Sequence, residues 1–393
     1  MDRRALFMTI PCLGVAPAAR GAQTERMHAR AVRLIAIVLG LVTAACSPQS
    51  SGHANALPAT ASGATRSTLA QTAYRLVKTV DLRTTFGYGS AAFPNIESMG
   101  NLVADRVLPA VYFTYSYGDG QESHVFTDVR AVSASDTPAA VPSIPTYASA
   151  SQVAIGPRDS VWVTWSDFFS LDFPDAPVYG VNFAGAAGSG SVQVQDEYAQ
   201  MLFGADNGDE YFSDGSTIGL DSVVTQHALP AGVAFSSYAP DSNGGVWATD
   251  NVGHRIVRLV NGKIASSYAI AGRDALSMVT LGPSGDVWFT AGTATIGRLA
   301  VASGTSMLTA APNVTLVESL AVGKDDAAYF IGTDNANHTS IGTVLPQGTA
   351  SATLAGDPIP QSIVSTADGS LWVGRMMIEP SGICDCEVDQ FRS

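Results

Sequence analysis

Charged side chains are scarce in this sequence, and positive charge is the scarcer kind. Charged residues make up 14% of the 393 residues, with 21 basic and 34 acidic side chains and a formal net charge of −13. No cluster of lysines and arginines is present that would attract phosphates, so nucleic acid is excluded as a partner. An acidic chain with an uncharged polar surface suits a soluble protein outside the cytoplasm.

Sequence motifs with a known catalytic mechanism are also missing. The chain has no G-x-S-x-G nucleophile turn, no H-E-x-x-H zinc motif and no phosphate-binding loop. An acidic run around Tyr211 lacks the glycine and glutamate spacing of an EF-hand, and turn-forming aspartates explain it better. The motifs therefore predict no metal site and no cofactor.

Cysteine is rare, with four residues in the whole chain. Cys12 and Cys46 lie near the N-terminus, whereas Cys384 and Cys386 form a Cys-Asp-Cys near the C-terminus. A disulfide between two residues this close would close a strained ring, and too few further ligands lie nearby for a metal. The sequence leaves this second pair without an assigned role.

The stretch from Leu281 to Leu299, LGPSGDVWFTAGTATIGRL, shows the unit from which most of the chain is built. A Pro-Ser-Gly-Asp turn precedes a short apolar run, and a small polar connector separates it from a second apolar run. This is the pattern of a turn, a strand, a hairpin loop and another strand. One hairpin cannot bury its single apolar face alone, so the unit needs neighbours.

An aromatic residue in the same context recurs seven times, at successive spacings of 50, 49, 36, 41, 41 and 43 residues. A period of about 40 to 45 residues with this signature is typical of four-stranded propeller blades. We therefore predict an all-β fold, a seven-bladed β-propeller of four-stranded antiparallel blades, over residues 73–393. The repeated aromatic residues are Tyr112, Trp162, Tyr211, Trp247, Trp288, Tyr329 and Trp372.

One predicted strand, Tyr74–Leu82, has no hairpin partner nearby in the sequence. The chain also ends soon after its seventh hairpin, which leaves the last blade short of a strand. The first and last blades must be joined if the ring is to have no open edge. We therefore predict that this N-terminal strand closes the ring as the outermost strand of the Trp372 blade, in a monomer.

The N-terminal region predicts export and lipid attachment. Residues 1–26 resemble an upstream extension, because Met27 begins a better targeting segment with two arginines, a short apolar core and small residues before Cys46. Residues 27–45 therefore form a signal peptide, too short to span a membrane. The letters TAAC that end at Cys46 resemble a bacterial lipobox, which predicts cleavage before Cys46 and its acylation. Ordinary signal-peptide cleavage nearby is the alternative.

The segment after the predicted cleavage site favours a location in the bacterial cell envelope. Ser47, rather than aspartate, follows the cysteine, which by analogy with enteric bacteria favours the outer membrane, facing the periplasm. Residues 46–72 have almost no large apolar side chain and are expected to be a flexible tether. The lipid would then be the only contact with the membrane.

A set of polar residues stands at the predicted start of every inner strand, eleven residues before each repeated aromatic residue. Inner strands line the central channel of a propeller, and ligands often bind at its mouth. We call this set the collar and predict that it holds a small polar ligand by hydrogen bonds; polar strand starts near water are the alternative. The collar residues are Asn101, Ser151, Gln200, Ser236, Ser277, Glu318 and Gln361.

The blade motif G-P-x-G-x-[VL]-W-F-T, followed by I-G-R-L, resembles the virginiamycin B lyase (streptogramin lyase) family over roughly residues 74–393. The Trp288 repeat matches almost letter for letter, whereas the Tyr112, Trp162 and Tyr211 repeats match loosely. This resemblance implies a seven-bladed propeller. It also implies an activity, the cleavage of a cyclic depsipeptide antibiotic by magnesium-assisted elimination.

The catalytic residues that this resemblance implies are not retained. The family uses a histidine at the start of one late inner strand and a Glu-x-His at the start of the next. By blade order these positions fall on Glu318, and on Ile359 with Gln361. Glutamine and isoleucine neither bind a metal as imidazole does nor move protons near neutral pH.

Two kinds of function therefore remain open. The first is a lipid-anchored propeller without catalysis that binds a small polar ligand or a protein. The second is a magnesium-dependent carbon–oxygen lyase, or a lactonase-like hydrolase, with a rebuilt site. Such a site would use Glu318 with carboxylates on the channel rim, such as Asp214 or Asp250. One carboxylate in the collar is too few for a divalent metal, which favours the binding protein.

Overall fold

A computed structural model describes most of residues 74–393. The gaps within this range are 87–97, 119–124, 136–140, 146–147, 157–158, 168–177, 186–187, 195–200, 205–208, 213–215, 220, 222–223, 227–234, 242–244, 261–262, 273 and 379–383. The predicted signal peptide, Cys46 and the tether lie outside the described residues. Among those that are described, no helix is long and apolar enough to cross a membrane.

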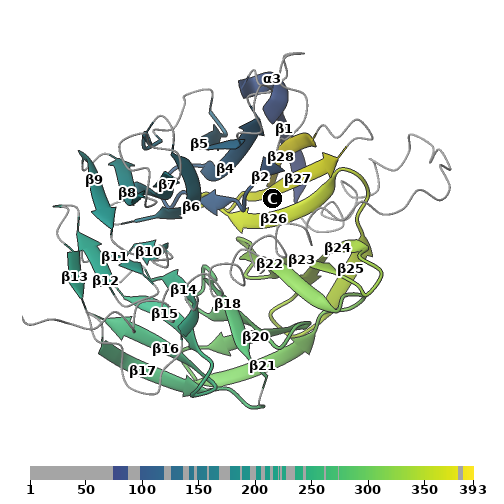
Figure 1. The fold of residues 1–393 in the computed structure, drawn as a ribbon. Coiled ribbons are helices and arrows are strands. Elements are labelled where there is room, and N and C mark those ends of the chain that lie inside the picture. The colour runs from purple at the N-terminus through teal and green to yellow at the C-terminus, as the bar shows by residue number, and fades with distance from the viewer. Residues whose placement is uncertain are drawn as a thin grey trace, which may run out of the picture. The chain divides into compact units, whose positions relative to one another are not determined.

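The described chain is an all-β propeller of four-stranded antiparallel blades (Figure 1). Five sheets each use four strands that are consecutive in the sequence. The first two are β6 (Ser149–Ile155), β7 (Val161–Asp167), β8 (Val178–Gly185) and β9 (Gly188–Val194), and then β10 (Met201–Gly204), β11 (Asp209–Phe212), β12 (Ser216–Gly219) and β13 (Val224–Gln226).

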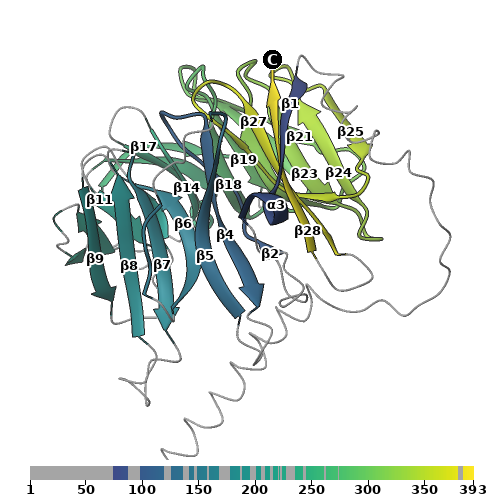
Figure 2. The ribbon, with the colours of Figure 1, turned by 90° about the horizontal axis from the view of Figure 1, so that it is seen from above.

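The other three of these sheets contain the best-matching sequence repeats. They are β14 (Phe235–Pro240), β15 (Val246–Asp250), β16 (Arg255–Val260) and β17 (Lys263–Ala269); β18 (Leu276–Leu281), β19 (Val287–Ala291), β20 (Thr295–Ala300) and β21 (Thr305–Ala310); and β22 (Leu316–Val322), β23 (Ala328–Thr333), β24 (Thr339–Val344) and β25 (Ala350–Leu354). Their strands run from one face of the ring to the other (Figure 2).

The last sheet contains the first strand of the propeller together with its last three strands. Its order is β1 (Arg75–Asp81), β28 (Cys384–Arg392), β27 (Leu371–Ile378) and β26 (Ile359–Ser365). The first strand pairs antiparallel with β28, from Arg75 opposite Arg392 to Asp81 opposite Glu387. The predicted pairing of the N-terminal strand with the last blade is therefore observed, and a short helix, α3 (Leu82–Phe86), follows it.

The first sheet departs from the predicted blade. It contains β2 (Ser98–Met99), β3 (Val103–Ala104), β4 (Ala110–Gly118) and β5 (Val125–Ser133). Both β2 and β3 pair with the same edge of β4, so the sheet is only three strands deep. Six complete four-stranded blades are therefore described, and the prediction of seven four-stranded blades is wrong. The inner strand is broken between β2 and β3, where the amide of Leu102 donates to Ser362 Oγ of the last sheet.

Adjacent inner strands contact one another in the order β3, β6, β10, β14, β18, β22 and β26, and β26 contacts β3 in turn. Serine hydroxyls near the starts of three inner strands join adjacent sheets by accepting a backbone N–H from the next one. The three bonds run from Val279 N to Ser237 Oγ (3.0 Å), from Ile363 N to Ser319 Oγ (2.9 Å) and from Leu102 N to Ser362 Oγ (3.2 Å).

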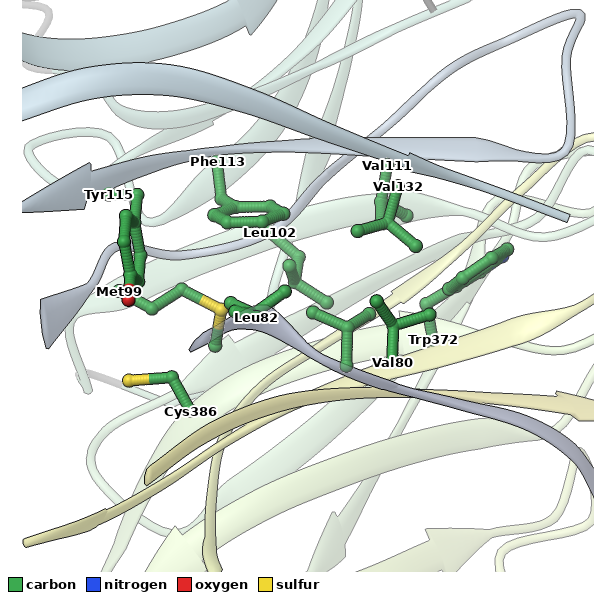
Figure 3. Packing of buried hydrophobic residues seen from close by; sticks show 11 residues of the cluster. Val80, Leu82, Met99, Leu102, Val111, Phe113, Tyr115, Val132, Trp372 and Cys386 are labelled. Carbon is green, nitrogen blue, oxygen red and sulfur yellow. The ribbon is translucent and has the colours of Figure 1, made fainter. Parts of the chain in front are cut away.

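The repeated aromatic residues form the core between the sheets. Trp162, Trp288, Tyr329 and Trp372 are completely buried, as the repeat predicts. Between the first and last sheets, Phe113 and Val132 of the first meet Val80 and Trp372 of the last (Figure 3). Burying a side chain of this size contributes about 1.5–3 kcal/mol, so the hairpins are stable only as neighbours in the ring.

Candidate functional site

The collar residues coincide with irregularities in the inner strands. The pairing of the inner strand shifts register at Ser151, Ser236, Glu318 and Gln361, each of which lies between two residues paired in different registers. A β-bulge of this kind bends the strand and redirects its side chain. Polar residues at this position therefore have a structural cause that the sequence pattern alone does not show.

Two further collar residues lie beside such an irregularity. At Ser277 the shift comes one residue later, at Met278, whose backbone has a φ of 41°. Asn101 lies in the break between β2 and β3. The collar residues that the structure describes are thus all at the same end of their strands, while Gln200 lies outside the described residues.

Some collar side chains are already engaged in the fold. Ser236 Oγ lies 2.8 Å from Thr249 Oγ1 and donates to the carbonyl of Leu276 at 2.6 Å. Ser277 Oγ lies 2.7 Å from Thr290 Oγ1. These two serines therefore hold the inner strand to its neighbours, which reduces their capacity to bind a ligand.

The positions matched to the family's catalytic residues also lie at this end. Glu318 is exposed, and its Oε1 accepts a hydrogen bond from Thr333 Oγ1 at 3.2 Å. Ile359 is 37% exposed, and Gln361 is partly buried. These three side chains supply one charged ligand or base, the Glu318 carboxylate, and no imidazole.

Of the two suggested rim carboxylates, the structure describes Asp250. Asp250 is fully buried and forms an ion pair with Arg255, Oδ2 to Nε, at 2.7 Å. Its carboxylate is therefore paired inside the fold and does not face the channel as a metal ligand. The expectation that Asp250 helps Glu318 to bind a metal is wrong. Asp214 lies outside the described residues. Within the part of the chain that the structure describes, no three His, Cys, Asp or Glu side chains are grouped to hold a metal ion.

One histidine near this end is oriented by a carboxylate. His338 Nδ1 lies 3.1 Å from Asp334 Oδ2 in the exposed turn between β23 and β24. The backbone N–H of His338, the imidazole and the N–H of Ala336 all lower the pKa of Asp334, against a smaller opposing effect of burial. These bonds close a local turn, so they explain the geometry without a ligand.

The large cavity of the propeller lies at the other end of the inner strands. It has a volume of about 1480 Å³ and is lined by the later halves of the inner strands and the turns that follow them. None of the described collar residues lines it. The predicted collar therefore does not include the residues around this cavity. The missed signal was the charged residues just after the inner strands, such as Arg106, Asp241 and Lys324.

Three acidic and three basic side chains line this cavity within the described residues: Asp105, Asp241, Asp368, Arg106, Arg258 and Lys324. The charged side chains that line the cavity thus sum to zero, whereas the whole protein has a net charge of −13. Towards the β14–β17 blade it extends to Trp247 and Tyr268, whose ring centroids are 5.8 Å apart. Burial raises the pKa of Tyr238, another lining residue, so its hydroxyl stays protonated.

The fold and these two channel ends define the class of protein: a β-propeller of four-stranded blades with polar residues at one mouth and a cavity at the other. The chain matches no protein-family model and no curated protein sequence. Solved structures similar to it include virginiamycin B lyase from Staphylococcus aureus, with 15% identity and a TM-score of 0.50, over 81% of this chain and 99% of that one.

Two other solved structures align less well. A streptogramin B lyase is 17% identical with a TM-score of 0.49, covering 76% of this chain and 96% of that chain. The WD40 propeller domain of Doa1 is 10% identical with a TM-score of 0.46, covering 82% of this chain and 98% of that chain. At such identities the likeness extends to the fold alone. The resemblance to virginiamycin B lyase that the blade motif suggested thus holds at the level of structure.

Proposed function

We propose that this chain is a binding propeller without lyase activity that holds a small polar ligand, or a protein, at the collar mouth. The observation that supports this most strongly is the set of side chains at the three matched catalytic positions. There the chain has Glu318, Ile359 and Gln361. Elimination needs both a base and an electrophile for the developing enolate, and members of such a unit lose nearly all their effect when several are missing.

We also propose that the seven sheets form one closed ring, with β1 as the closing strand. The hydrogen bond from Leu102 N to Ser362 Oγ, 3.2 Å long, supports this because it joins the first sheet to the last. The hydrophobic cluster that includes Val80, Phe113 and Trp372 supports it as well, since its members come from both sheets. Closure leaves no open sheet edge between these two blades.

The proposed absence of catalysis is tested with a B-type streptogramin and Mg²⁺, using virginiamycin B lyase as the positive control. We expect no turnover by the purified propeller, and none by its Glu318→Gln variant. Because general-base catalysis alone contributes about 10²- to 10⁴-fold, even a partly functional site would be detected. Turnover that disappears in the variant would establish the lyase alternative and overturn the binding protein.

The same alternative requires a metal. A calorimetric titration with Mg²⁺, Ca²⁺ and Mn²⁺ is expected to give no saturable heat, because hard cations prefer several oxygen ligands and the collar supplies one carboxylate. Saturable binding that is lost in Glu318→Gln would favour a rebuilt lyase or lactonase-like site. The control is Asp326→Asn, which alters a carboxylate in the turn after β22, at the opposite end of that strand from Glu318.

We further propose that the mature protein is acylated at Cys46 and lies in the bacterial cell envelope, at the outer membrane facing the periplasm. The TAAC sequence before Ser47 supports this assignment. The lipid would bring the collar and its ligand close to the membrane while the propeller stays in the aqueous phase.

A further inference from the structure

The cavity opposite the collar has carboxylates that are already satisfied within the fold. Asp105 is 3% exposed; its Oδ1 accepts the backbone N–H groups of Val107 and Leu108, each at 2.8 Å, and its Oδ2 accepts the Tyr112 hydroxyl at 3.0 Å. Asp241 is 7% exposed and forms an ion pair with Arg258. These two carboxylates have little capacity left for a ligand.

The third lining carboxylate is similarly engaged. Asp368 accepts the Thr366 hydroxyl at 2.7 Å, and the Ser370 amide and hydroxyl at 3.0 and 2.9 Å. Burial raises the pKa of Asp368, but these hydrogen bonds and the charge of Arg392 together lower it below its ordinary value. The Asp368 carboxylate therefore remains ionised and bound to its own turn.

The cation Lys324 is in a different situation. Its aliphatic stem lies against Gly369 of the neighbouring sheet, and its residue is exposed at the cavity. Its ammonium group makes no hydrogen bond or ion pair with the part of the chain that the structure describes. Arg106, also on the wall, donates from Nη2 to the carbonyl of Ile155 at 3.2 Å, so its guanidinium is already engaged within the fold.

The remaining wall combines apolar and polar surface. Its apolar residues include Val103, Val153, Ala154, Leu320 and Val364, contributed by different sheets. Ligand cavities of this type bury an apolar body and use a few polar groups to orient it. The combination of satisfied carboxylates, an available ammonium and apolar walls favours a ligand of one kind.

We propose that this cavity is a second binding site, for a small organic anion with an apolar body. The body packs against the inner-strand walls, and the carboxylate, phosphate or sulfonate head pairs with Lys324. This site is separate from the collar, so its failure would leave the proposed function unaffected.

The test uses two fluorescent probes with the same aromatic body, anilinonaphthalene sulfonate and the uncharged N-phenyl naphthylamine, titrated into the folded propeller. We expect saturable binding of the sulfonate at one site per chain. Lys324→Met should weaken it about tenfold, as expected for one lost charge-assisted contact, and should leave the uncharged probe within about twofold.

Two variants serve as comparisons. Lys263→Met removes an exposed charge from the first residue of β17, which does not line the cavity, and should change neither probe. Ala104→Phe places a large side chain on the cavity wall and should weaken both probes. Thermal melting checks that every variant is folded.

Three outcomes would overturn the proposal. The first is no saturable binding of the sulfonate. The second is an equal effect of Lys324→Met and Lys263→Met, which would show that only the net charge matters. The third is a loss of both probes in Lys324→Met with normal melting, which would show that the lysine stem shapes the cavity and its charge does not select the ligand.

Discussion

At the scale of single residues, Tyr74 shows how one side chain joins three parts of the chain. It is completely buried, its ring packs edge-on against Tyr329 at 5.3 Å, and its hydroxyl bridges two turns. The hydroxyl donates to the carbonyl of Gly369 at 3.0 Å and accepts the amide of Lys324 at 2.8 Å. Burial raises the pKa of Tyr74, so this hydroxyl remains a donor at neutral pH.

Replacing Tyr74 by phenylalanine should remove the hydroxyl that pairs with the carbonyl of Gly369 and the N–H of Lys324, both in partly buried hydrogen bonds. We expect the free energy of unfolding to fall by about 1–3 kcal/mol. Urea unfolding measures this, with Tyr268→Phe as the control, because that partly buried ring should lose little with its hydroxyl. Equal effects of the two substitutions would contradict the bridging role.

A second prediction at this scale concerns the pH dependence of Asp368. Its pKa in the folded protein lies below the ordinary value of 3.8, so the folded state binds fewer protons than the unfolded state as the pH falls. The stabilisation is therefore complete above the unfolded pKa and is lost as the pH falls through the lower, folded pKa. The difference in unfolding free energy between wild type and Asp368→Asn should be largest near neutral pH.

That difference should shrink below about pH 4, where the carboxylate begins to be protonated in the unfolded chain. Urea unfolding at a series of pH values measures it. A difference that stays constant down to pH 3 would show that the Thr366 and Ser370 bonds do not favour the charged form.

At the scale of elements, the N-terminal strand contributes to two core clusters. Val80 and Leu82 pack in the cluster between the first and last sheets, while Tyr74 packs in the one between the last sheet and the β22–β25 blade. The strand also covers the edge of β28. Its loss would therefore expose apolar surface on both sides of the last sheet as well as an unpaired edge.

A chain that begins at residue 83 should lose on the order of 5 kcal/mol or more, from three buried side chains at about 1.5–3 kcal/mol each. A loss of that size is comparable to the whole stability of many domains. The control begins at residue 73 and should melt like the full chain. Equal melting temperatures for the two would contradict a closing role for β1. If the shorter chain is insoluble, Leu82→Ala should still lower stability by about 2–5 kcal/mol.

At the scale of the whole molecule, attachment to the membrane depends on one residue outside the propeller. Cys46→Ser should release the protein into the soluble periplasmic fraction, because the tether after it has no apolar run to bind a bilayer. Cell fractionation with an antibody against the propeller measures this. A serine variant that still sediments with the membranes would contradict the lipoprotein prediction.

The blades were predictable from the sequence because their cause is local. An apolar strand after a tight turn, with a tryptophan or tyrosine at its centre, needs a neighbouring hairpin to bury that ring, and the repeated spacing supplies one. Trp162, Trp288 and Trp372 are buried for this reason. The resemblance in blade motif pointed to the right kind of fold for the same reason.

The irregular first sheet and the position of the cavity depend on contacts between blades, which the sequence does not show. No sequence rule indicates that the amide of Leu102, in the break of the first inner strand, donates to Ser362, 260 positions away. The collar positions share polar side chains, but β-bulges at residues such as Ser236 explain part of this pattern. The cavity lies at the other end because the later halves of the inner strands, and the turns after them that hold Arg106 and Lys324, face one space only when the blades assemble.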